Sequence, residues 1–262
     1  MFIALDDEQA ALRDELRQYY RDLMTPEVRR SLEHEEGTGP LRRQIVEQLG
    51  TDGWITMGWP EEFGGQGKSA VEQFIFYDET MRAGSPAPML TINTVGPTIM
   101  EYGTEEQKAF FLPEISAGRL HFCIGYSEPD AGTDLASLTT RAVRDGDEYV
   151  LNGQKTWTSL ALGCDYIWLA ARTNPDVSKH KGISLFAIPI DTPGITLEPL
   201  SLLSTHNCNH TFFDDVRVPA SAMVGDENQG WRLITSQLNR ERVTLCSSAV
   251  IERAIENALE WA

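Results

Sequence analysis

The sequence predicts an α+β chain, with an N-terminal helical domain, a central β-barrel or sandwich domain and the start of a C-terminal helical bundle. Apolar residues recur at helical spacing through the first 118 residues. From residue 121 they gather in short runs between proline- and glycine-containing turns, a pattern typical of strands. Helical spacing returns near Trp231. We therefore expect domains at 1–118, 119–228 and 229–262.

Composition narrows the class of protein. The 262 residues, 41% of them apolar and 23% charged, are typical of a globular chain with one large or two modest domains. The net charge of −17 argues against nucleic acid and anionic membranes as partners. We expect no membrane span and no signal peptide, because no apolar run is long enough and no basic segment precedes an apolar core. The four cysteines lie far apart, which favours free thiols in the cytoplasm.

The helical part has recognisable starts and ends. Capping boxes predict three helix starts: Asp6 with Gln9, Ser69 with Glu72, and Thr104 with Gln107. The first begins an amphipathic helix over 7–23. A second helix is expected over 41–49, ended by Gly50. Residues 90–102 are largely apolar and predict a buried helix.

A glycine-rich loop over 53–67 has two interpretations. Its aromatic residues favour an anchored loop, and its glycines disfavour regular structure. Gly67-Lys68-Ser69 also resembles the end of a phosphate-binding loop. That pattern requires a glycine where Glu62 stands, so we prefer the anchored loop.

The segment 121–159 carries the most informative sequence. Residues 121–126 predict a buried strand, and the proline and glycine of 128–133 predict a turn. Asn152-Gly153 predicts a hairpin turn, after which a strand would bring Trp157 and Ser159 close to the first turn. Further strands are expected at 166–171, 183–188 and 195–200.

The first turn could bind a ligand. Small residues allow close approach, and free N–H groups with the Ser127 and Thr133 hydroxyls suit an anionic or carbonyl-rich molecule. A sheet hairpin with a polar turn is the alternative. A metal site is a further alternative, because His206-Asn207-Cys208-Asn209-His210 would place ligands on one face of a strand. No fourth ligand is evident, and we expect no bound metal.

Ordered motifs resemble the acyl-CoA dehydrogenase family. Tyr126-Ser127-Glu128-Pro129-Asp130-Ala131-Gly132-Thr133-Asp134 is similar to its Y-S-E-P-x-A-G-[ST]-D element, and Asn152 to Ser159 to its N-G-x-K-x-W-x-[ST] element. The segments 59–67 and 212–231 are similar to two further elements. The resemblance implies that FAD binds the central domain through seven residues: Tyr126, Ser127, Gly132, Thr133, Trp157, Thr158 and Ser159.

The resemblance also implies individual roles. Ser127 would bond the pyrimidine end of the isoalloxazine, and Ser159 would lie near N5. Trp157 would cover the flavin face that the substrate does not use. Thr133 would contact substrate as well as cofactor.

The implied reaction is α,β-desaturation of an acyl-CoA thioester, which needs a positioned base. Glu241, in Leu238-Asn239-Arg240-Glu241-Arg242, matches the family members that carry this base on the same helix. Asn239 and Arg242 would contact the substrate. By spacing alone, Glu241 is better explained as a member of a surface ion pair, and only the resemblance favours the base.

The resemblance extends to partners. It is strongest to actinobacterial subunits of sterol side-chain degradation, which form mixed α2β2 assemblies and imply a steroid-CoA substrate and electron-transfer flavoprotein as acceptor. The family has a longer C-terminal bundle, so we expect a fragment or a chain completed by a partner, with exposed apolar helix faces. The alternatives are a non-catalytic partner subunit and a flavin oxidase or monooxygenase on the same fold.

Overall fold

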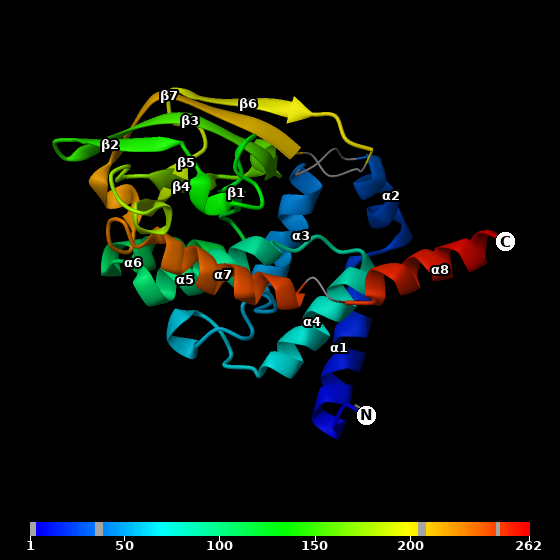
Figure 1. The fold of residues 1–262 in the computed structure, drawn as a ribbon. Helices are drawn as coiled ribbons and strands as arrows, with labels where there is room; N and C mark the ends of the chain where they lie inside the picture. Colours follow the sequence, from blue (N-terminus) through cyan, green and yellow to red (C-terminus); the bar gives the residue numbers. More distant parts are fainter. Residues whose placement is uncertain (1–3, 35–38, 204–207, 245–246) are drawn as a thin grey trace.

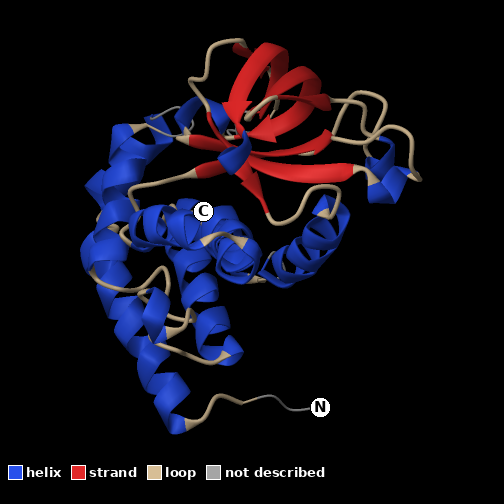
Figure 2. Cartoon of the chain, turned by 90° about the vertical axis from the view of Figure 1, so that its left-hand side faces the viewer, coloured by secondary structure: helices blue, strands red, loops and turns tan. Residues whose placement is uncertain are grey.

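A helical layer lies against one side of a twisted sheet (Figures 1 and 2). The computed structural model describes residues 4–34, 39–203, 208–244 and 247–262, with the backbone alone at residues 34, 240–244 and 260. Helices precede the sheet in the chain and follow it again at the C-terminus, as the α+β prediction requires.

Six α-helices come before the first strand among the described residues. They are α1 (Asp7–Leu23), α2 (Pro26–His34), α3 (Pro40–Thr51), α4 (Ala70–Ala83), α5 (Gly96–Tyr102) and α6 (Glu105–Ser116). The predicted capping boxes are present at the starts of α1, α4 and α6, so the sequence located these helices correctly. Helix α2 was not predicted.

Two helix predictions need correction. Gly50 lies inside α3 and does not end it. A Cβ there would lie 2.4 Å from the carbonyl carbon of Ala117, so the glycine allows α3 to approach the end of α6. The predicted helix over 90–102 is divided into a π-helix, Thr91–Val95, and α5. Such π-helical turns often occur at functional sites.

The central domain forms one mixed sheet. Its strands are β1 (Phe122–Gly125), β2 (Arg141–Asp145), β3 (Glu148–Ser159), β4 (Tyr166–Arg172), β5 (Ile183–Pro189), β6 (Ile195–Leu200), β7 (Cys208–Pro219) and β8 (Met223–Val224). Their order is β6-β7-β3-β2-β4-β5-β8, and β1 pairs with β4 in parallel. The strands predicted after residue 160 are confirmed.

The predicted hairpin at Asn152-Gly153 is wrong. Residues 148–159 form the single strand β3, and the turn from β2 lies at Gly146, whose φ of 64° suits glycine. Asn152 is paired with Arg141 of β2, and its side chain exchanges two hydrogen bonds with Asp215. The tertiary pairing on both sides of β3 therefore overrides the local turn signal.

The sheet is buried on both faces at its centre. On β4, Trp168 and Ala170 join the core shared with the helices, whereas Ile167, Leu169 and Ala171 join a second core enclosed by the strands. Such a strand reads as a continuous apolar run. The sheet thus has its own core, as expected for a barrel-like domain, and a second face for the helical layer.

Two helices follow the sheet. Helix α7 (Gly230–Thr244) lies beside α5 beneath the sheet, and α8 (Ala249–Trp261) extends away from the domain (Figure 1). The helical region expected over 229–262 therefore consists of two helices in the described chain. The expectation of exposed apolar faces is confirmed on α8 for Val250, Ile251, Ile255, Leu259 and Trp261.

Candidate functional site

The turn after β1 is held by its own backbone. The amides and carbonyls of Glu128 and Ala131 exchange two hydrogen bonds of 3.1 Å, so the polypeptide reverses tightly over these residues. Gly132 and Thr133 are exposed at the tip. A Cβ at Gly132 would meet nothing within 4 Å, so there is open space beside the backbone for a ligand.

A buried ion pair fastens this turn to β3. The Lys155 ammonium lies 2.8 Å from the Glu128 carboxylate and 3.1 Å from the Tyr126 carbonyl oxygen, and the Lys155 side chain is fully buried. The other Glu128 oxygen accepts hydrogen bonds from the backbone amide and hydroxyl of Thr139. Every oxygen of this buried carboxylate is therefore satisfied, as a buried charge requires.

The ion pair changes the ionisation of both partners. Burial lowers the pKa of Lys155 to about 8, although the Glu128 charge opposes this shift. Burial alone would raise the pKa of Glu128, but the charge and hydrogen bond of Lys155 outweigh it and bring the pKa to about 2. Glu128 is thus ionised at neutral pH, and the turn has a fixed electrostatic anchor.

An irregularity in β3 turns Trp157 outward. The pairing of β3 with β7 shifts register between Lys155 and Thr158, and Trp157 adopts a φ of 60°. This conformation is strained for a bulky residue and is typical of functional sites. The indole is 59% exposed although its neighbours Thr156 and Thr158 are buried. Trp157 therefore presents an aromatic surface to an incoming planar ligand.

The predicted cofactor residues divide into two groups. Gly132, Thr133, Trp157 and Ser159 are exposed and Ser127 is half-buried, and the Thr156 amide donates to the Ser127 carbonyl at 2.9 Å. The side chains of Tyr126 and Thr158 are buried.

Thr158 has no side-chain surface left for a cofactor. Its hydroxyl is 3.1 Å from that of Thr211 and is fully buried. Its carbonyl accepts from the Asn209 side-chain amide at 3.1 Å, and the whole residue is buried, so Thr158 supports the site from within the sheet. Ser159 is the better candidate, because it is exposed and carries a hydroxyl. This hydroxyl lies 3.2 Å from the Cys208 sulfur.

Tyr126 connects the turn to α7. Its hydroxyl donates a 2.6 Å hydrogen bond to the amide oxygen of Gln237, and the indole N–H of Trp168 lies 3.0 Å from the same oxygen. All three side chains are buried. Sequence reasoning missed Gln237 and Trp168 because their contacts span 111 and 69 residues. A signal was present in the polar Gln237 within the apolar stripe of α7.

The predicted substrate residues lie further along α7. Asn239 is exposed. Glu241 and Arg242 belong to the last turn of the helix, and their side chains lie outside the described part of the structure. Gln237 and Glu241 are four residues apart, one helical turn.

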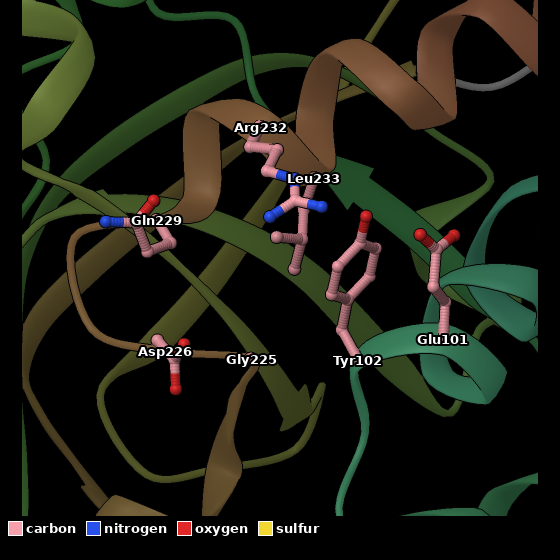
Figure 3. Close-up of a pocket in the computed structure, with 7 residues that line it drawn as sticks. All are labelled: Glu101, Tyr102, Gly225, Asp226, Gln229, Arg232 and Leu233. Carbon is pink, nitrogen blue, oxygen red and sulfur yellow. The ribbon is translucent and has the colours of Figure 1, made fainter.

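Two cavities lie away from these residues. One of about 300 Å³ is bordered by the end of α5 and the start of α7, where the Arg232 guanidinium lies 5.6 Å from the centre of the Tyr102 ring (Figure 3). The other, of about 650 Å³, lies where α3 ends beside Gly64 and α6. Neither cavity includes a predicted cofactor residue.

The alternative ligand sites gain no support. Within the described ranges there is no group of three or more His, Cys, Asp or Glu that could hold a metal, and His206 lies outside those ranges. Lys68 pairs with Glu72 at 3.0 Å, and Ser69 caps α4, so the phosphate-loop residues have structural roles. No helix in the described chain has the length and apolarity needed to cross a membrane.

Comparison with known proteins identifies the class. Models of the acyl-CoA dehydrogenase N-terminal and middle domains match residues 6–119 and 123–216. The chain is 54% identical to acyl-CoA dehydrogenase FadE26 of Mycobacterium tuberculosis, with 100% of this chain and 67% of that protein covered. It is 49% identical to FadE29 of the same organism, with 100% and 68% covered.

Solved structures of acyl-CoA dehydrogenases are also similar to this chain. A chain in the crystal structure of the ChsE4–ChsE5 complex from Mycobacterium tuberculosis matches with a TM-score of 0.91 and 54% identity, covering 100% of this chain and 67% of that one. The Tcur3481–Tcur3483 steroid acyl-CoA dehydrogenase matches with a TM-score of 0.93 and 49% identity, covering 100% and 68%. The chain belongs to the acyl-CoA dehydrogenase family, which comprises FAD-dependent oxidoreductases acting on CH–CH groups.

Proposed function

We propose that the chain is a subunit of an FAD-dependent acyl-CoA dehydrogenase that desaturates an acyl-CoA thioester between its α and β carbons. The observation that carries this proposal is the Tyr126–Gln237 hydrogen bond. It joins the turn that would hold the cofactor to the helix that carries Glu241. The hydride acceptor and the base would therefore be held at fixed positions relative to each other. We further propose that 1–118, 119–228 and 229–262 are its domains.

The exposed groups of the turn and β3 fit a flavin. Gly132 leaves its backbone open to close approach, Trp157 offers a planar apolar surface, and Ser127, Thr133 and Ser159 supply hydroxyls. We propose that Tyr126 and Thr158 support the cofactor site from beneath it, since both residues are buried and their carbonyls accept from Lys155 and Asn209. When bound, FAD supplies the acceptor for the β-hydrogen, which leaves the acyl chain as hydride.

The carboxylate of Glu241 would take the α proton. That C–H is acidified by the thioester carbonyl but still needs a base held in place, and a helix supplies the rigidity. As the α proton and the β hydride leave, the electron pair of the α C–H bond forms the new double bond. Removal of water by the acyl chain would raise the pKa of the Glu241 carboxyl and make it a stronger base. Asn239 and Arg242 would contact the substrate.

The relatives suggest the substrate and the partners. The similarity to a steroid acyl-CoA dehydrogenase and to a chain of the ChsE4–ChsE5 complex supports a steroid side-chain CoA ester and a mixed assembly of the α2β2 kind. Electron-transfer flavoprotein would reoxidise the flavin. The three described cysteines are buried free thiols, which is consistent with our proposal of a cytoplasmic location.

The test is anaerobic reduction of the bound flavin. The chain is co-expressed with a homologous partner subunit, and the absorbance of the purified yellow complex is followed after addition of acyl-CoA. Bleaching by a steroid side-chain CoA ester, faster than by a saturated straight-chain acyl-CoA, is the expected result. A flavin that keeps its colour with every thioester would contradict dehydrogenation. It would favour the alternative, a non-catalytic partner subunit. Rapid reoxidation by air would indicate an oxidase or monooxygenase.

A further inference from the structure

The side-chain amide of Gln237 lies at the centre of the contact between α7 and the sheet. Gln237 is 1% exposed, and Trp168, on the sheet side of the contact, is fully buried. The amide oxygen of Gln237 accepts from the Tyr126 hydroxyl at 2.6 Å and from the Trp168 indole N–H at 3.0 Å. The indole N–H also lies 3.1 Å from the Tyr126 hydroxyl oxygen, so the three groups form a closed triangle.

The triangle fixes which way the amide points. An indole N–H can only donate, so the group that faces Trp168 must be the oxygen of Gln237. A flipped amide would bring two donors together at 3.0 Å. The amide nitrogen is therefore directed away from Tyr126 and Trp168, with both of its hydrogens available.

This nitrogen has no acceptor among the described residues. A buried donor without a partner destabilises the folded state, and a native protein rarely retains one without a reason. The adjacent π-helix, against which α7 packs, also carries buried hydroxyls, but Thr91 accepts from the Phe122 amide and Thr94 donates to the Leu90 carbonyl. The hydroxyls of Thr91 and Thr94 are thus engaged, whereas the Gln237 nitrogen has no partner in the described part of the chain.

We propose that Gln237 is a specificity-determining residue, whose amide N–H donates to an oxygen on the acyl group of the substrate. The inference rests on the proposed function, and it adds a substrate class: acyl groups that carry a keto or hydroxyl oxygen. Positions 237 and 241 are one turn apart, so this oxygen would bind roughly 5–6 Å along the helix from the base. A pure hydrocarbon would leave the amide buried without a partner, and a site built for a hydrogen bond discriminates against such analogues.

The probes are cyclohexylpropanoyl-CoA and its three ring-ketone isomers, whose dissociation constants for the flavin-loaded complex are measured by calorimetry. For the native complex, we expect at least one ketone to bind about tenfold more tightly than the hydrocarbon, which corresponds to one hydrogen bond. Equal or weaker binding of all three ketones would overturn the proposal, and this comparison needs no variant.

The variant Gln237→Met keeps the length of the side chain and removes the donor, together with the oxygen that accepts from Tyr126 and Trp168. We expect it to abolish the preference for the ketone, which means that ketone binding weakens about tenfold more than hydrocarbon binding. Thr235→Val is the matched control, because Thr235 is exposed and its hydroxyl bonds only carbonyls of its own helix. An unchanged preference in Gln237→Met would show that the amide serves another group. An equal loss for both probes would show that Gln237 only supports the fold. Either result overturns the proposal.

Flavin bleaching separates this inference from the proposed function. Bleaching by the hydrocarbon thioester without any preference for a ketone keeps the dehydrogenase and rejects the role of Gln237. A ketone preference that Gln237→Met removes, without bleaching by any thioester, keeps the binding role and rejects the dehydrogenase.

Discussion

At the scale of single residues, Glu128 and Lys155 hold the turn of the candidate site in place. Both side chains are buried, and each satisfies the charge of the other. Their contacts reach Tyr126 on one side and Thr139 on the other. The groups that we propose to face the flavin are therefore positioned by residues that would not themselves touch the cofactor.

Removing one partner of this ion pair will lower the free energy of unfolding more than removing both partners. We expect Glu128→Gln to lower the free energy of unfolding by about 3–5 kcal/mol, because Lys155 remains buried without its counter-charge. The double variant Glu128→Gln, Lys155→Met should recover much of that loss. Denaturant unfolding of the three proteins measures both values. A double variant less stable than the single one would mean that the pair itself is a strong source of stability.

The same pair predicts a dependence on acid. Between its ordinary pKa of 4.5 and about 2, Glu128 binds fewer protons in the folded than in the unfolded chain. Its contribution to stability is complete above 4.5 and declines as the pH falls toward 2. We expect the free energy of unfolding to fall less between about pH 5 and about pH 3 in the double variant than in the native chain. Equal declines in both proteins would contradict the low pKa of Glu128.

A variant at Gly132 tests cofactor binding without disturbing the fold. Since a Cβ at this position meets nothing and the φ is not in the left-handed region, Gly132→Ala should change the free energy of unfolding by less than about 0.5 kcal/mol. We expect it to weaken FAD binding if the flavin approaches this backbone, as measured by the flavin content of the purified complex. Full flavin content in the variant would mean that the cofactor lies elsewhere.

The candidate site could be only partly predicted from sequence at this scale. The motif residues Ser127, Thr133, Trp157 and Ser159 carry a local signal that survives without a structure. Gln237 carries a weaker signal, a polar residue within the apolar stripe of α7, which becomes informative only when its partners Tyr126 and Trp168 are known. Long-range contacts of this kind leave no pattern in the sequence around any one residue.

At the scale of elements, caps and periodicity predicted most helices, whereas the ends of strands depended on pairing. The boxes at α1, α4 and α6 are local devices, so the sequence located them correctly. Helix α2 has no capping box, and the apolar pattern of α7 and α8 does not show that they are separate helices. The hairpin was misplaced because Asn152-Gly153 is a strong turn signal that the neighbouring strands override.

Two glycines of the central sheet test this explanation. Gly153 has a φ of 147°, and a Cβ there would lie 2.7 Å from the Thr140 Cα, so we expect Gly153→Ala to destabilise the chain by about 2 kcal/mol or more. Gly146, at the actual turn, also has a positive φ but open space around it. Gly146→Ala should therefore cost only about 1–2 kcal/mol. Thermal unfolding compares the two, and a larger loss at Gly146 would contradict the assigned pairing.

At the scale of the whole molecule, the chain brings a cofactor surface and a helix with a candidate base into one body. The sheet presents Trp157 and the turn, and α7 packs on the same domain through Gln237. The apolar face of α8 is exposed, and about a third of the length of the relatives lies outside the part that this chain matches. We therefore propose that the activity belongs to an assembly in which this face of α8 is covered.

The most direct test of the central claim is the rate of anaerobic flavin bleaching in Glu241→Gln. The variant loses the base and keeps the shape of the side chain, so we expect the rate to fall by about a hundredfold or more at unchanged flavin content. Glu256→Gln on α8 is the matched control and should bleach at the native rate. Bleaching of Glu241→Gln at the native rate would contradict the claim that α7 supplies the base.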